Sequence, residues 1–153
     1  MTLNVNEPID QRAASELPGY IRENRVEINT LAAGGAVAQT NLTVSAGMVS
    51  LAIGTELSAV GLETIFVTGS GVAALATILG GTDGQIKVFI FNDANVDLVD
   101  GVKSGGAFYL NHLPALSNFA PQQGDVIALR NIGGDGASVY GYWKELYRTI
   151  AVK

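Results

Sequence analysis

The 153-residue sequence contains no cysteine, a single histidine and only nine lysine and arginine residues. The absence of cysteine excludes disulfides, thiol chemistry and cysteine-ligated zinc. One histidine is too few for a histidine-rich metal site. The basic residues form no cluster, and the net charge of −5 argues against nucleic acid as a partner, because nucleic acids bind to basic surfaces.

Charged residues of both signs are scarce, at 15% of the chain, whereas apolar residues make up 48%. An average soluble domain has about 25% charged residues. Such a chain either enters a membrane or hides apolar surface against other subunits. The uncharged run 64–82 is interrupted by glycines and threonines and is flanked by the acidic Glu63 and Asp83, which disfavours a membrane-spanning helix. We therefore expect no membrane partner and expect subunit contacts instead.

Much of the charge lies within residues 9–31, which we predict to be helical, with Pro18 at the first position of the longer helix. A 4-3-4-3 spacing, typical of a heptad seam, runs through Leu17, Ile21, Asn24, Ile28 and Leu31. Two interpretations are open. The helix forms a short coiled coil that joins subunits, with Asn24 fixing the register, or it lies as an amphipathic helix on its own domain.

After a glycine-rich hinge at 32–35, the apolar period changes from 3.6 residues to 2. Residues 85–91 alternate most cleanly and place Lys87 on the same face as Phe89 and Phe91. Further strands are predicted on both sides of the turn at 46–47 and at 63–68, 72–79, 96–99, 107–110, 125–132 and 139–147. We expect residues 1–35 to be an N-terminal helical arm and hinge, and 36–153 to be a β-rich body that forms a single, mainly β, sandwich or barrel-like domain.

Several short patterns suggest chemistry but are incomplete. Residues 69–74 match the glycine pattern of a dinucleotide site, yet no repeated βαβ units surround them, so a turn between two strands explains the glycines. Residues 93–97 begin like a calcium loop, but Leu98 and Ser104 stand where that loop requires glycine and glutamate. The sequence has no G-x-S-x-G elbow to present a serine nucleophile, which a catalytic triad using His112 would need. We expect no catalytic residue, no cofactor and no metal, and hence no enzyme.

The C-terminal region is rich in aromatic residues, namely Tyr140, Tyr142, Trp143 and Tyr147. Aromatic faces bind sugars, so one interpretation is a glycan platform. In a strand, however, Tyr140 and Tyr142 share one face while Trp143 takes the other. That arrangement favours packing on both sides, either in a final strand that closes a sheet or in an intersubunit seam formed by Tyr140, Tyr142 and Trp143.

Residues 8–12, PIDQR, and 15–25, SELPGYIRENR, resemble the N-terminal segment of small virion structural proteins of tailed bacteriophages. The second half resembles a β module of phage fibres and capsid decorations, with a G-x-I strand at 84–86, a G-D-x-I-x-L strand at 124–129 and a closing W-x-E-x-x-R strand at 143–148.

The resemblance implies a homotrimer on the virion. One role is a capsid cement or decoration protein that binds the major capsid protein at the capsid surface, after synthesis in the host cytoplasm. The alternative is a tail-fibre or receptor-binding head module that recognises a host-surface glycan. We favour the cement role, because so short a chain leaves little room for a fibre shaft and because a hinged arm suits a clamp between capsid subunits.

Overall fold

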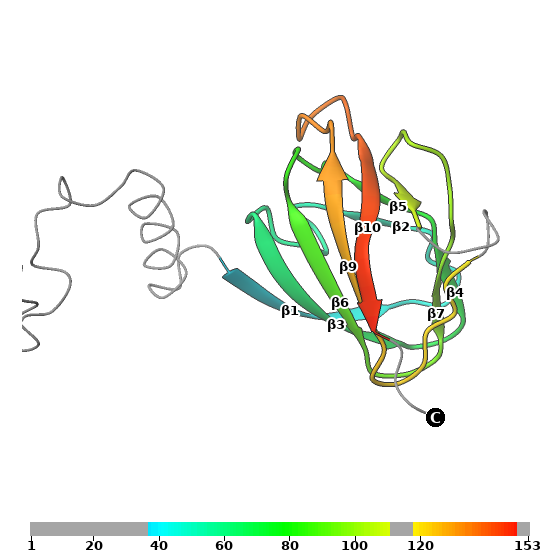
Figure 1. The fold of residues 1–153 in the computed structure, drawn as a ribbon. Coiled ribbons are helices and arrows are strands. Elements are labelled where there is room, and N and C mark those ends of the chain that lie inside the picture. Colours follow the sequence, from blue (N-terminus) through cyan, green and yellow to red (C-terminus); the bar gives the residue numbers. More distant parts are fainter. Residues whose placement is uncertain (1–36, 111–117, 150–153) are drawn as a thin grey trace, which may run out of the picture. The chain divides into compact units, whose positions relative to one another are not determined.

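The computed structural model describes residues 37–110 and 118–149 (Figure 1). All of them belong to one compact unit. The predicted N-terminal helix and its seam residues lie outside the described residues, and so does His112.

The described residues form ten β-strands and contain no helix. The strands are β1 (Val37–Val44), β2 (Ser50–Ala52), β3 (Leu62–Gly69), β4 (Ala73–Leu75), β5 (Thr77–Leu79), β6 (Ile86–Phe91), β7 (Val96–Leu98), β8 (Ala107–Tyr109), β9 (Val126–Ile132) and β10 (Tyr142–Thr149). The prediction that the body is mainly β is therefore confirmed.

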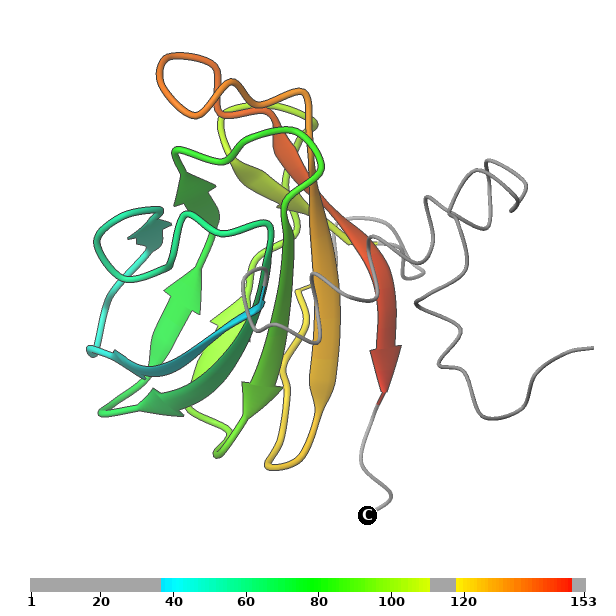
Figure 2. The same ribbon diagram turned by 90° about the vertical axis from the view of Figure 1, so that its left-hand side faces the viewer.

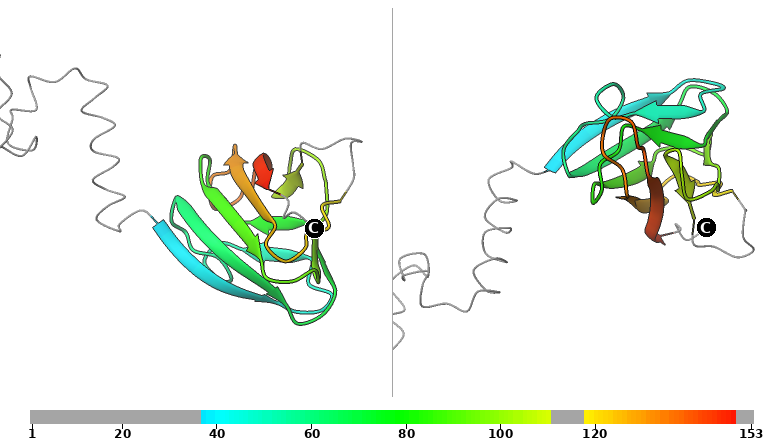
Figure 3. Two further views of the ribbon diagram at one scale, coloured as in Figure 1. Left: turned by 60° about the horizontal axis from the view of Figure 1, so that its bottom comes forward. Right: turned by 90° about the horizontal axis from the view of Figure 1, so that it is seen from above.

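Eight of the strands form one sheet in the order β1-β3-β6-β9-β10-β8-β5-β2, and β4 pairs with β7 in a separate two-stranded sheet. The large sheet curls strongly but stays open, because β1 and β2 are its two edges (Figure 2 and Figure 3). The predicted sandwich or barrel is thus an open half-barrel. The strands on either side of the turn at 46–47 do not pair with each other, since β1 pairs with β3 and β2 pairs with β5.

The hydrophobic core lies on the inner, concave face of the sheet. Strand β6 shows the alternation that builds it, because Phe89 and Phe91 are fully buried while Val88 and Ile90 are half-buried on the outer face. This confirms the alternation predicted for residues 85–91. The largest fully buried apolar side chains are those of Leu51, Ile65, Leu75, Ile78, Phe89, Phe91, Leu98, Phe108, Ile127, Leu129 and Trp143.

Candidate functional site

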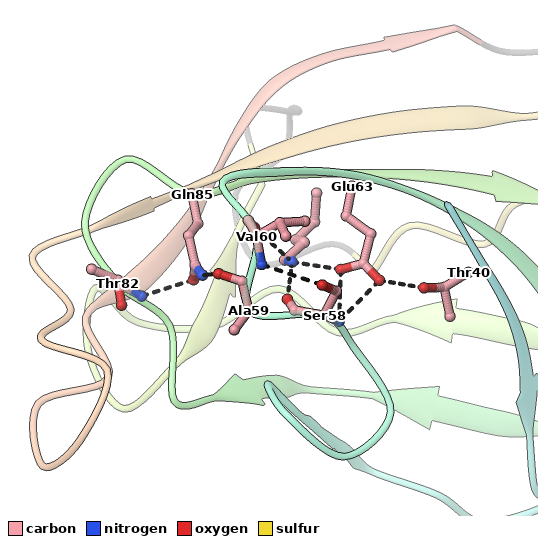
Figure 4. A network of polar contacts seen from close by, with 8 residues as sticks. Thr40, Ser58, Ala59, Val60, Glu63, Thr82 and Gln85 are labelled. Carbon is pink, nitrogen blue, oxygen red and sulfur yellow. Dashed lines mark hydrogen bonds and ion pairs between the residues drawn. The ribbon is translucent and has the colours of Figure 1, made fainter. Parts of the chain in front are cut away.

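A buried ion pair joins β3 and β6 on the inner face of the sheet (Figure 4). Lys87 Nζ lies 2.5 Å from Glu63 Oε2, and both side chains are fully buried. The two residues are partners in the parallel register of β3 and β6, so strand pairing brings them together across 24 positions of sequence. Charged side chains are almost never fully buried unless they are paired.

The remaining polar atoms of the pair are also hydrogen-bonded. Thr40 Oγ1 donates to Glu63 Oε1 at 2.5 Å, and the backbone N–H of Ser58 donates to both carboxylate oxygens at 3.0 and 3.1 Å. Lys87 donates to the carbonyl oxygens of Ser58 at 2.6 Å and of Val60 at 3.4 Å. The three protons of the ammonium therefore have three acceptors, as the burial of a lysine requires.

The segment 58–60 is held by a second polar side chain, that of Gln85 just before β6. Gln85 Nε2 donates to the Ala59 carbonyl oxygen at 2.9 Å, and its Oε1 accepts from the Thr82 N–H at 2.9 Å (Figure 4). Lys87 and Gln85 thus bind consecutive carbonyls of the loop that leads into β3. The network fixes this loop against the sheet.

Burial lowers the pKa of the Lys87 ammonium below its usual 10.5, although the hydrogen bond and the charge of Glu63 act in the opposite direction. A lysine with a lowered pKa is the kind that serves as a nucleophile or base. Lys87 has no exposed surface, however, and its donors are used within the fold. Its contacts are those of a structural residue that links β6 to β3 and to the loop 58–60.

The closing W-x-E-x-x-R strand is β10, and its three motif residues contact the inner side of the sheet. Trp143 is fully buried, and its Nε1 donates to the Ile78 carbonyl oxygen at 3.0 Å. Glu145 accepts from Arg148 through both oxygens, each at 2.6 Å, and the Arg148 guanidinium lies 4.4 Å from the centre of the Phe119 ring. Trp143 therefore links β10 to β5, whereas the Glu145–Arg148 pair lies within β10 and packs on Phe119.

A β-bulge explains the uneven spacing of this motif. The register of β10 against β9 shifts between Glu145 and Tyr147. Regular alternation would place Tyr147 on the inner side after Trp143 and Glu145. The shift gives that orientation to Arg148 instead, and Tyr147 is 53% exposed.

An open groove of about 490 Å³ lies between residues 103–105 and the segment 132–142. Tyr140 and Tyr142 line it and are half-buried, whereas the buried Trp143 is not part of its lining. Tyr142 makes an edge-to-face contact with Tyr109 at 6.0 Å between ring centres, and Lys103 Nζ lies 4.7 Å from the Tyr109 ring. Aromatic faces beside polar groups are suited to a ligand that has both apolar and polar surface.

The loop along this groove is ordered by the exposed carboxylate of Asp135. Asp135 Oδ1 accepts from the backbone N–H groups of Ala137, Ser138 and Val139 at 2.8 to 2.9 Å. These backbone hydrogen bonds lower the pKa of Asp135 from 3.8 to about 2. At neutral pH the Asp135 carboxylate therefore stays charged, and its hydrogen bonds order the loop that carries Tyr140.

The two incomplete motifs of the sequence are turns. The glycines at 69–71 end β3 and precede β4, which confirms that they connect two strands. Asp93 accepts from the backbone N–H groups of Gly69 and Asn95, each at 2.9 Å, so it stabilises the neighbouring turn. Within residues 37–110 and 118–149, no three acidic or histidine side chains are grouped to hold a metal ion. The described part of the chain also contains no helix that would cross a membrane.

Sequence reasoning did not single out Glu63, Lys87 or their partners Thr40 and Ser58. The available signal was the position of Lys87 on the same face as two phenylalanines. Comparison with protein-family models, with curated proteins and with solved structures finds no match to this chain.

Proposed function

We propose that this protein is a non-enzymatic virion structural protein, a capsid cement protein that stabilises a phage head as a homotrimer. Its partners are two further copies of the chain and the major capsid protein. The proposal rests on the resemblance in sequence and on one structural observation, the apolar outer face of the sheet.

Three neighbouring strands carry this outer face. Phe66 on β3, Ile90 on β6 and Val126 on β9 lie opposite one another in the strand register and are all half-buried. The adjacent rung contains Thr64, Val88 and Ala128, of which Ala128 is buried. Apolar side chains on the outer face of a sheet are typical of surfaces that pack against another subunit. This face supplies the subunit contact that the low charge content of the chain leads us to expect.

The polar groups of the inner face support a structural role. The Glu63–Lys87 pair makes hydrogen bonds that hold β3, β6 and the loop 58–60 together, and the Glu145–Arg148 pair spans the bulge within β10. Neither pair leaves the carboxylate and base side by side in an open cleft, which general acid–base catalysis needs. These contacts favour a building block over an enzyme.

Two measurements test the proposal. Light scattering of the full chain should give about three times its mass of 15.9 kDa, or a multiple of that trimer mass, and gold-labelled antibody should decorate phage heads in a regular pattern. The variant Ile90→Lys should weaken the trimer, whereas Thr55→Lys, which adds the same charge in an exposed turn, should not. A stable monomer at micromolar concentration, or gold confined to the tail, contradicts the cement role.

The second candidate is a tail-fibre or receptor-binding module that recognises a host-surface glycan, and the groove with Tyr140 and Tyr142 favours it. A glycan array with the full chain should then give hits that Tyr142→Ala abolishes. Tyr147→Ala is the matched control, because Tyr147 is exposed and lies outside the groove. An array without hits contradicts this candidate.

A further inference from the structure

Strand β1 forms one edge of the large sheet and is long for an edge strand. It has eight residues and a single partner strand, β3, among the residues that the structure describes (Figure 1). The opposite edge strand, β2, has only three residues. Short edge strands offer little for another chain to pair with, whereas a long one is a template for pairing.

The backbone direction of β1 identifies the groups at the open edge. The Val44 carbonyl oxygen accepts from the Ser70 N–H at 2.9 Å, so the backbone groups of Val44 point toward β3. Backbone groups alternate in direction along a strand. Those of Gln39, Asn41 and Thr43 therefore point away from β3, along the open side of the sheet.

Within β1 itself, three features by which proteins block strand pairing are absent. The sequence of β1, VAQTNLTV, contains no charged residue and no proline. Its register with β3 is continuous from Val37 to Val44, without a bulge. Charged side chains, prolines and bulges are the usual protection of edge strands. The absence of all three marks β1 as a surface for a further strand.

We propose that the edge of β1 pairs with β1 of a second copy of this chain, antiparallel and across a two-fold axis. The strand suits itself as a partner, because an uncharged edge brings no like charges together in a homotypic contact. Leu42 and Val44 are buried and would continue the core face, while the exposed Gln39, Asn41 and Thr43 would face their counterparts on the outer face.

The alternation of backbone groups restricts the register. Only residues whose N–H and C=O point outward pair through hydrogen bonds, so odd-numbered residues of β1 lie opposite odd-numbered residues of its copy. Asn41 then lies opposite Asn41, Gln39 or Thr43 of the second copy, close to the two-fold axis. This contact is separate from the three-fold contact of the proposed trimer.

Cross-linking tests this contact, since the chain has no cysteine of its own. The full chain with Asn41→Cys, treated with a thiol reagent that spans about two strand spacings, should form a covalent dimer in high yield. Thr55→Cys places the same thiol in an exposed turn and is the matched control. A yield at position 41 no higher than at position 55 overturns the proposal.

Sedimentation gives an independent readout. Asn41→Lys puts two like charges at the axis and should halve the mass of the largest species, whereas Thr55→Lys should leave it unchanged. An unchanged mass for Asn41→Lys overturns the edge contact. If trimers form but position 41 gives no cross-link, the β1 contact is refuted and the proposed trimer is not. If position 41 gives cross-linked dimers but no trimer forms, the proposed trimer is refuted and the β1 contact is not.

Discussion

The ammonium group of Lys87 lies 2.5 Å from the carboxylate of Glu63, and neither side chain has exposed surface. Removing two charges from water is costly, and the attraction between them offsets that cost only when the geometry is good and the other polar atoms are satisfied. Here Thr40, Ser58 and Val60 satisfy them. The pair therefore holds the loop 58–60 and the strands β3 and β6 in one arrangement.

Lys87→Met should strongly destabilise the protein, because it leaves the Glu63 carboxylate buried without its partner. We expect the free energy of unfolding in urea to fall by about 3–5 kcal/mol. The double variant Lys87→Met with Glu63→Leu removes both charges and should recover at least about 1 kcal/mol of that loss. A double variant no more stable than the single one contradicts this account of the pair.

The stability of the protein should depend on the titration of Lys87 at alkaline pH. Its pKa is lowered in the folded state, so between that pKa and 10.5 the unfolded chain binds more protons than the folded one. The contribution of Lys87 to the free energy of unfolding therefore rises with pH across this window. Unfolding in urea at several alkaline pH values should show this rise relative to Lys87→Met. A difference that is constant or falls with pH contradicts the prediction.

Trp143→Phe should lower stability by about 1–3 kcal/mol, because it removes the indole donor and leaves the Ile78 carbonyl oxygen without it in the core. Tyr147→Phe on the same strand removes a hydroxyl from a residue that is 53% exposed and should change stability by less than about 0.5 kcal/mol. Thermal or urea unfolding of both variants measures the difference. Equal effects would show that the hydrogen bond of Trp143 contributes nothing.

Gly141→Ala should be far more damaging than Gly47→Ala, although both glycines have positive φ, 59° and 75°. A Cβ at Gly141 would lie 2.2 Å from the Ile132 carbonyl oxygen, whereas at Gly47 nothing lies within 4 Å. Gly47→Ala should cost only the backbone strain, about 1–2 kcal/mol, and Gly141→Ala at least about 2 kcal/mol more. Urea unfolding compares them, and similar losses contradict the clash.

Much of the secondary structure follows from local sequence patterns. The alternation at 85–91 predicts β6 with its correct faces, because the side chains of a strand point alternately to either side of the sheet. Glycine-rich turns mark most of the strand ends in the same way. The segment 72–79 was predicted as one stretch and is two short strands, β4 and β5, which belong to different sheets.

The candidate sites depend on contacts that local patterns do not encode. The sequence places Lys87 on the face of Phe89 and Phe91, but its partner Glu63 lies 24 residues earlier. In the same way, only the fold brings Lys103 to the groove of Tyr140 and Tyr142 and places Tyr109 against Tyr142.

The sequence by itself determined that the body of this protein is mainly β, where its main strands run and which face of β6 is apolar, since these depend on residues a few positions apart. Only the tertiary structure decided that β1 and β2 lie at opposite edges of an open sheet and that Glu63 and Lys87 meet in its core. Strand order and register are set by packing between distant segments, and many pairings satisfy the same alternating pattern.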